Sequence, residues 1–196
     1  RGREIMIETI LGLCIGIGLS AACGFRVFVP LLVMSVAALM GWFEPRKGFE
    51  WLAIPSVCVA LGIATVCEIA AYYIPWVDNV LDTVATPAAM IAGTLTTMAV
   101  STGEMSQIAS KAAAIIIGGG TATAVQMSTV AVRGVSTATT GGIANPVVST
   151  VEWIGAVIVS IMAMLLPVVV AILVVIFIFL AVRWIKRKRQ ENAFNA

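Results

Sequence analysis

The sequence predicts an all-α membrane protein, a polytopic bundle of about six transmembrane helices, within a range of five to seven. The chain of 196 residues is 60% hydrophobic and 11% charged, whereas soluble domains carry about 25% charged residues. Its longest apolar stretch, 149–185, holds one carboxylate and one arginine. Backbone amides in lipid must be paired internally, and long apolar runs without alternation achieve this as helices.

Six apolar segments follow one another along the chain, at 7–22, 27–43, 51–75, 84–100, 107–132 and 149–185. The first two are short for a span. We expect a break near Gly24, with Pro30 opening the next helix. The break is either a tight turn at the membrane surface or a re-entrant turn inside the membrane. The last exceeds the roughly 20 residues that a crossing needs, and Pro167 lies near its middle.

Positive charge gives the expected orientation, because lysine and arginine concentrate in cytoplasmic loops. We therefore expect the protein in the inner membrane of a bacterial cell, with its basic tail at 186–196 in the cytoplasm. If the last segment crosses once, Arg46 and Lys47 are cytoplasmic as well and there are six spans. If Pro167 turns the chain between two spans, this loop lies outside and there are seven. We favour six.

The chain is expected to be one integral membrane domain over 1–196, since no linker is long enough to hold a soluble domain. One interpretation takes Met6 as the natural start and 1–5 as an extension added for expression. The chain has no histidine, and its four cysteines lie in apolar runs without a Cys-x-x-Cys pair. No cofactor is therefore expected. The net charge of +2 makes nucleic acid an unlikely partner.

Small residues recur at the spacing that lets helices approach closely in lipid. One stripe consists of Gly12, Gly16, Ser20 and Gly24, and a second begins with Gly118, Gly119 and Gly120. They predict helix packing within the bundle or between copies; alternatively, the triple glycine loosens its helix and exposes carbonyl groups. Each stripe leads to an arginine, Arg26 or Arg133, which suggests a weak internal repeat.

Glu68 is the strongest candidate for a functional residue. It lies in an apolar segment about two turns, or roughly 10 Å, before the Ile-Pro pair at 74–75. An ionisable group at that depth is costly and normally faces a partner, a cavity or a transport route. We expect Glu68 to bind or couple a solute; the alternative is a structural pair with Arg26 or Arg133.

Asp78 and Asp82 follow shortly after, with Asn79 between them. Their i, i+4 spacing places both carboxylates on one helix face. The three side chains would form an oxygen-rich mouth suited to a hard cation. The alternative is a solvated loop that Trp76 anchors at the membrane interface. The sequence leaves open whether a metal binds.

Arg26 and Glu152 complete the candidate binding site. Arg26 stands at the break between two apolar segments, where we expect it to pair with Glu68 or Glu152. Binding of an anionic headgroup, or snorkelling to the surface, is the alternative. Glu152 has an alternative of its own, because Ser149-x-x-Glu152 has the spacing of a capping box that opens a helix.

Enzyme signatures are missing from the sequence. It contains no Gly-x-Ser-x-Gly elbow, no Walker loop and no histidine for acid–base chemistry. The aspartates that an intramembrane aspartyl enzyme would need lie at the end of a span. We therefore expect no enzymatic activity.

Three stretches resemble a known family: GLSAACGFRVFVP at 18–30, Glu68 followed by IPWVD at 74–78, and NPVVSTVE at 145–152. They resemble a bacterial multi-pass membrane family described as domain of unknown function 4126, over about 8–180. In that family an acidic residue often stands before the Ile-Pro pair and another beside the later glutamate. Ala71 and Trp153 stand there in this chain, which weakens the expectation of a dense acidic site. The resemblance implies topology and site residues but no substrate.

The sequence thus predicts a transporter of a small solute or cation. Glu68 is the expected coupling carboxylate, Arg26 its counter-charge, and Asp78 with Asp82 the mouth. We expect a homo-oligomer, most simply a dimer, in contact with the lipid bilayer and its solute. The alternatives are a non-transporting scaffold that packs through its glycine stripes and a passive ion channel.

Overall fold

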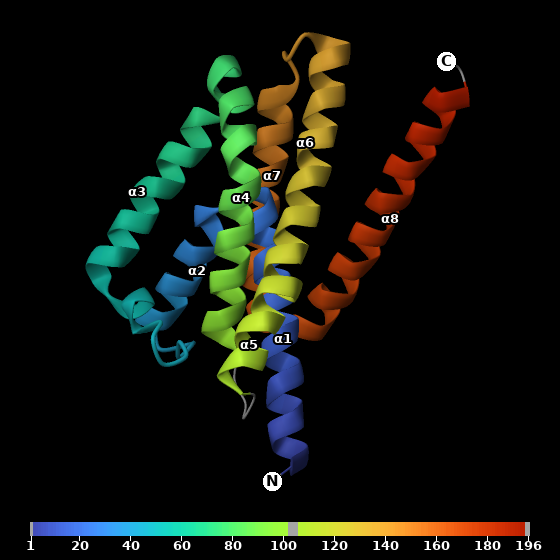
Figure 1. Ribbon diagram of the computed structural model, residues 1–196. Coiled ribbons are helices and arrows are strands. Elements are labelled where there is room, and N and C mark those ends of the chain that lie inside the picture. Colours follow the sequence, from blue (N-terminus) through green and yellow to red (C-terminus); the bar gives the residue numbers. More distant parts are fainter. Residues whose placement is uncertain (1, 102–105, 195–196) are drawn as a thin grey trace.

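The computed structural model describes residues 2–101 and 106–194, with the side chains of these residues except at 75, 76, 78, 79, 185, 186 and 188–194. Over these residues the chain forms helices and turns without a β-strand (Figure 1). The expected all-α membrane bundle is therefore confirmed.

Prolines open many of the helices, because the fixed φ of proline suits the first helical turn and its missing N–H has no helical partner there. Pro55, Pro75, Pro146 and Pro167 all take this place. The elements in chain order are α1 (Gly2–Phe25), α2 (Phe28–Leu39), the 3₁₀ turn η1 (Glu50–Ala53), α3 (Pro55–Ala71), α4 (Pro75–Val100), α5 (Gln107–Ala113), the π-helical turn η2 (Ala114–Gly119), α6 (Gly120–Thr140), α7 (Asn145–Leu165) and α8 (Pro167–Phe194).

Five helical segments of the described chain are long and apolar enough to cross a membrane. They are α1, α4, the continuous run from α5 to α6, α7 and α8, whereas α2 and α3 are shorter apolar helices. The expected range of five to seven spans contains this result.

Helices α1 and α2 form a re-entrant pair. α1 stops inside the bundle, where a Cβ on Gly24 would lie 2.6 Å from the Cβ of Val125, near the middle of the run from α5 to α6. α2 then returns, and in the loop after it the Arg46 N–H donates to the Ala99 carbonyl at the end of α4 (2.9 Å). The chain therefore enters and leaves at the same end of the bundle (Figure 1). Of the two turns that the sequence allowed, the structure contains the re-entrant one.

Pro167 divides the last apolar segment into two helices. α7 ends at Leu165, and α8 runs back towards the opposite end, because a proline ring cannot continue the preceding helix. The loop with Arg46 and Lys47 and the far end of α8 consequently lie at opposite ends of the bundle (Figure 1). The favoured prediction, in which 149–185 crosses the membrane once, is therefore wrong, and the structure has the alternative turn at Pro167.

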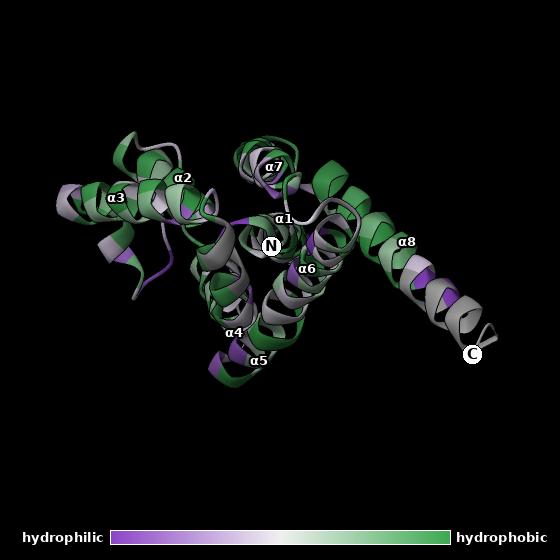
Figure 2. Ribbon diagram, turned by 90° about the horizontal axis from the view of Figure 1, so that it is seen from above, coloured by the Kyte–Doolittle hydropathy of each residue, from purple (hydrophilic) through white to green (hydrophobic). Residues whose placement is uncertain are grey.

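The core of the bundle surrounds α1. Seen from above, α4, α6 and α7 stand around it, α2 and α3 lie on one side, and α8 leans outward on the other (Figure 2). α1 packs against α4, α6, α7 and α8. Its final turns, from Leu19 to Gly24, are buried throughout.

The two glycine stripes are largely used inside this chain. A Cβ on Gly16 would lie 2.9 Å from the Thr97 side chain, one on Gly118 would lie 2.4 Å from the Gly93 carbonyl oxygen, and one on Gly119 would lie 2.8 Å from the Thr94 hydroxyl. Gly12 and Ser20 are buried. Gly120 differs, because it is exposed and nothing lies within 4 Å of its added Cβ.

Candidate functional site

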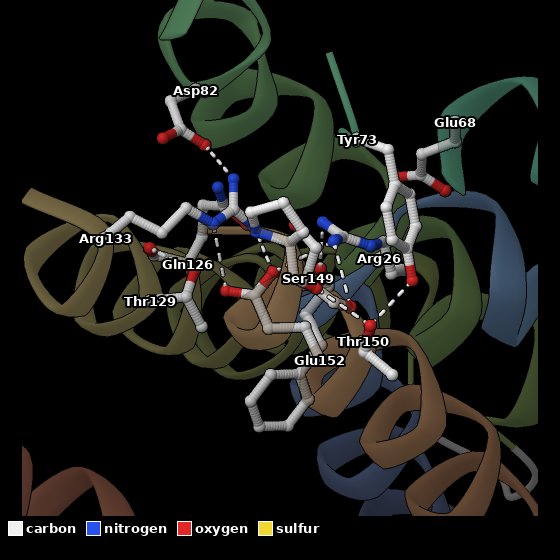
Figure 3. A network of polar contacts seen from close by, with 12 residues as sticks. Arg26, Glu68, Tyr73, Asp82, Gln126, Thr129, Arg133, Ser149, Thr150 and Glu152 are labelled. Atoms are coloured by element: carbon white, nitrogen blue, oxygen red, sulfur yellow. Dashed lines mark hydrogen bonds and ion pairs between the residues drawn. The ribbon is translucent and has the colours of Figure 1, made fainter. Parts of the chain in front are cut away.

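A group of buried polar side chains lies beside the point where α1 ends (Figure 3). We call Arg26, Tyr72, Asp82, Arg133 and Glu152 the charged cluster. Arg26 follows α1, Tyr72 ends α3, and the other three residues come from α4, α6 and α7. The cluster therefore joins parts of the chain that are far apart in sequence.

Glu152 is the hub of the cluster. Its Oε2 pairs with Nη2 of Arg26 at 3.0 Å and accepts a second, short bond from Nη2 of Arg133. Its Oε1 accepts from Nε of Arg133 at 3.2 Å. Arg26 also donates to the Ser149 carbonyl at 3.3 Å. One carboxylate thus binds both guanidinium groups, and the Glu152 side chain is 5% exposed.

Tyr72 and Asp82 complete the cluster. Both guanidinium groups lie over the Tyr72 ring, with their central carbons 3.9 Å (Arg26) and 4.2 Å (Arg133) from its centroid. Such stacking is worth about 0.5–2 kcal/mol per cation. Asp82 accepts from Nη1 of Arg133 at 2.5 Å and is the more exposed member of that pair. Two arginines and two carboxylates therefore balance their formal charges within the cluster.

Glu68 has a different partner from the one predicted. Its two carboxylate oxygens accept from the backbone N–H groups of Val27 (2.7 Å) and Phe28 (3.1 Å), at the start of α2. A carboxylate at this position satisfies amides that have no helical partner and lies at the positive end of the helix dipole. Glu68 therefore links α3 to the re-entrant turn, and Arg26 pairs with Glu152 instead.

The remaining candidates fall in different places. Asp82 belongs to the charged cluster, whereas the side chain of Asp78 lies outside the described residues. The capping-box interpretation of Ser149 and Glu152 is wrong, since α7 begins at Asn145 and both residues lie inside it. One turn apart, they face the core rather than a helix end.

Sequence reasoning missed three residues of this region as site residues: Tyr72, Gln126 and Arg133. A signal for the last two exists, because Gln126, Thr129 and Arg133 recur at i, i+3 and i+7 in an otherwise apolar and small-residue segment. That spacing places them on one helix face. Tyr72 stands four residues after Glu68, and only its contact with two arginines reveals its role.

Buried donors without partners surround Glu152. Among the described side chains, Nε of Arg26, Nε2 of Gln126 and Oγ of Ser149 are buried and have no hydrogen-bond partner. Their residues are 1%, 2% and 0% exposed. Most buried polar atoms in proteins are hydrogen-bonded. The region consequently offers more donors than the protein itself uses.

Two cavities adjoin the cluster on different sides. The first, which we call the polar cleft, has a volume of about 590 Å³ and lies between α4 and α6, where it is lined by Asp82, Thr83, Val130, Arg133, Gly134 and Thr137. The second, the apolar cleft, has about 580 Å³ and lies between the bundle and α8, where its wall includes Phe25, Thr129, Val148, Glu152, Phe177 and Ala181. The pair of Arg133 and Glu152 separates the two clefts.

A third crevice, of about 470 Å³, lies between α3 and α4 and includes Glu68 and Tyr72 in its wall. Within the described residues, no group of three or more Asp, Glu, Cys or His side chains is placed to hold a metal ion. Asp82, which was expected at a cation mouth, binds Arg133 instead.

The fold and the site together define an α-helical membrane protein with a charged cluster buried among its helices. Sequence comparison then places it more closely: the family model for the domain of unknown function DUF4126 matches residues 13–187. The chain belongs to that family, as the resemblance had implied. No curated protein and no solved structure matches the chain.

Proposed function

We propose that this chain is a transporter of a small solute, with the charged cluster as its binding site and the polar cleft as the entrance. One observation carries the proposal: Arg133, a buried arginine inside a helical membrane bundle, lies in the wall of an open polar cleft and is bound to Glu152 on the far side. A charged group in the membrane interior costs several kcal/mol, and such groups are common in transport routes.

The broken helices support the same proposal. Transporter sites are often built where a helix is interrupted, so that free backbone groups meet the solute. Here the α1–α2 break places Arg26 in the cluster, and Glu68 occupies the amides at the start of α2. We accordingly assign solute binding to Arg26, Arg133 and Glu152, and we assign to Glu68 the positioning of the re-entrant turn.

Asp82 is the proposed gate of the polar cleft. It is the outer partner of Arg133 and lies in the cleft wall. A solute that reaches Arg133 from the polar cleft must displace or share this pair. The proposed order of events is opening of the Asp82–Arg133 pair, binding at Arg133, and passage past Glu152.

The test is solute-driven current in proteoliposomes, recorded on a solid-supported membrane with a panel of small carboxylates, amines and amino acids. At least one member should give a current that Asp82→Asn reduces at least tenfold. Glu50→Gln is the matched control, because Glu50 is an exposed carboxylate at the end of the bundle. A protein that carries no member of the panel, or carries one equally well after Asp82→Asn, would overturn the proposal. Steady conductance without a solute gradient would favour a passive channel.

The scaffold alternative retains one supporting observation, the small buried share of α8. Only 17% of its most apolar window is buried inside the chain. The glycine stripes are a weaker basis, since Gly16 already packs on Thr97 within the chain. Gly120 faces outward, so Gly120→Leu tests association without a clash inside the fold. Light scattering in detergent measures whether Gly120→Leu still forms dimers. If the variant loses them and the wild type transports no solute, the scaffold is favoured.

A further inference from the structure

The charged cluster and the apolar cleft meet at one residue, Glu152. Its carboxylate binds Arg26 and Arg133, and it also forms part of the wall of the apolar cleft. The rest of that wall is mainly aliphatic and aromatic, with Phe25 and Phe177 tilted against each other at 6.3 Å between ring centroids. A polar end and an apolar body are therefore adjacent in one site.

The polar end has unused capacity for an anion. Nε of Arg26, Nε2 of Gln126 and Oγ of Ser149 are buried donors without a partner among the described residues. Figure 3 shows Gln126 and Ser149 on either side of the bonds to Glu152. An incoming group rich in acceptors would satisfy these donors, and a cation would not.

The apolar body has the size and position for a chain of carbons. Its volume of about 580 Å³ lies within the roughly 300–1,000 Å³ usual for ligand pockets. The wall formed by α8 contributes Phe177, Leu180 and Ala181, and α8 leans away from the bundle at this side (Figure 2). The cleft therefore lies on the flank of the bundle that faces α8.

We propose that this site binds a single-chain amphiphilic carboxylate, with its head at Arg26 and Arg133 and its tail in the apolar cleft. The inference rests on one part of the proposed function, the charged cluster as a binding site, and names the class of ligand that binds there; it does not require that the ligand be transported. The head is assigned as a carboxylate because the site already holds one, that of Glu152. Glu152 occupies the place of the ligand head and must give it up when the ligand binds.

The exchange of carboxylates conserves charge if Glu152 takes a proton. Before binding, Glu152 and Asp82 balance Arg26 and Arg133. A bound anion adds one negative charge, and an isolated extra charge in a low-dielectric interior is costly. Protonation of Glu152 removes that charge, so each bound carboxylate takes up about one proton.

Trp184 in the wall of the apolar cleft makes the tail directly observable. Bromine quenches nearby tryptophan, so the probe is 9,10-dibromostearate added to the full chain in nanodiscs. We expect saturable quenching that is lost in Trp184→Phe. The methyl ester of the same acid, which lacks the charge, and acetate, which lacks the tail, should neither quench nor compete.

Two pairs of variants test the two ends of the site. Ser149→Ala removes a hydroxyl that has no partner, so the fold is preserved, and the affinity for dibromostearate should fall about tenfold. Ser160→Ala on the same helix is its control, because that hydroxyl bonds to the Ala156 carbonyl. Ala181→Phe fills the cleft and should abolish quenching, whereas Val182→Phe, at an exposed neighbour, should not.

A dye measurement of proton uptake in weak buffer tests the exchange itself. Wild type should take up about one proton per bound carboxylate, and Glu152→Gln should bind without uptake. Equal quenching by the methyl ester or by a brominated phospholipid would overturn the inference, since the cleft would then hold ordinary lipid. Quenching without current from any solute would remove the transport proposal alone. Current from short solutes without quenching would remove this inference alone.

Discussion

Helices α1 and α8 are both long and apolar, yet they occupy opposite situations in the bundle. In its most apolar window α1 is 39% buried, whereas α8 is 17% buried although it is the more hydrophobic of the two. α1 stands at the centre and ends at the charged cluster (Figures 1 and 2). α8 leans away and presents large aliphatic side chains on most of its surface.

The difference lies in side-chain size. From Gly12 onward α1 repeatedly presents glycine, alanine and serine, and the first part of α8 presents mainly valine, isoleucine, leucine and phenylalanine. Lipid tails are as apolar as leucine, so hydrophobicity does not draw one helix to another within a bilayer. Close packing and interhelical hydrogen bonds do, and α1 has both. The comparison teaches that size, more than hydropathy, decides which helix becomes central.

The largest expected change in the free energy of unfolding comes from replacing the buried arginine at the end of α1. Arg26→Gln removes one partner of Glu152 and should lower the free energy of unfolding by about 3 kcal/mol or more, because it disturbs a buried ion network. Arg183→Gln in α8 is the matched control and should change it by less than about 0.5 kcal/mol, since Arg183 is exposed. Unfolding in mixed detergent micelles, followed by circular dichroism, measures both. Equal effects would contradict the proposed difference between the regions.

A methyl group added to a glycine should have the next largest effect. The Cβ of Gly24→Ala would lie 2.6 Å from the Ala122 carbonyl oxygen, and such overpacking costs about 1–3 kcal/mol. At Gly62, in the outer helix α3, nothing lies within 4 Å. Gly62→Ala should therefore stabilise the protein by about 0.5–1 kcal/mol. Thermal unfolding in detergent should show opposite signs, and two shifts of the same sign would refute the packing argument.

Ser20→Ala should have a smaller effect. Its hydroxyl donates to the Gly93 carbonyl at 2.8 Å and pairs with the Thr97 hydroxyl at 2.8 Å, both on α4. Hydrogen bonds between membrane helices contribute about 0.6–1.7 kcal/mol. Ser128→Ala is the control, because that hydroxyl bonds to the Ala124 carbonyl of its own helix. The same unfolding assay distinguishes them, and a larger loss at Ser128 would be the unfavourable result.

The smallest effect is expected in α8. Leu173 is 59% exposed, so Leu173→Ala should change the free energy of unfolding by no more than about 0.5 kcal/mol. Leu19→Ala is the matched substitution in α1, where the side chain is fully buried, and it should be clearly destabilising. A large loss at Leu173 would show that α8 packs against something other than lipid, such as a second copy of the chain.

Much of the fold could be predicted from the sequence, because apolar length and proline act locally. Pro55, Pro75 and Pro167 open helices where the composition indicates breaks. The depth of the turn at Gly24 could not be predicted, since it depends on how Ala122 and Val125 of a distant helix receive it. Nor could the sequence decide whether a glycine stripe faces another helix of the same chain or a second chain.

The sequence predicted which residues belong to the candidate site better than it predicted which of them pair with one another. Arg26, Glu152 and Asp82 stand out as charges in or beside apolar segments, and all three belong to the charged cluster. Their partners depend on the rotation of each helix about its axis, which an i, i+4 pattern does not fix. Glu68 shows the same limit, because the backbone groups that it accepts from are present at every residue and leave no mark in the sequence.

The reversal of the chain between α1 and α2 has a consequence for insertion during synthesis. Because α1 begins and α2 ends at the same end of the bundle (Figure 1), the pair should add no net translocation, and the loop with Arg46 should stay on the side of the membrane where α1 enters. Each later helix from α3 to α8, with α5 and α6 counted together, runs from one end to the other (Figure 1). The start of α1 and the end of α8 therefore lie at opposite ends of the bundle (Figure 1). Reporters fused to the two termini should give opposite signals.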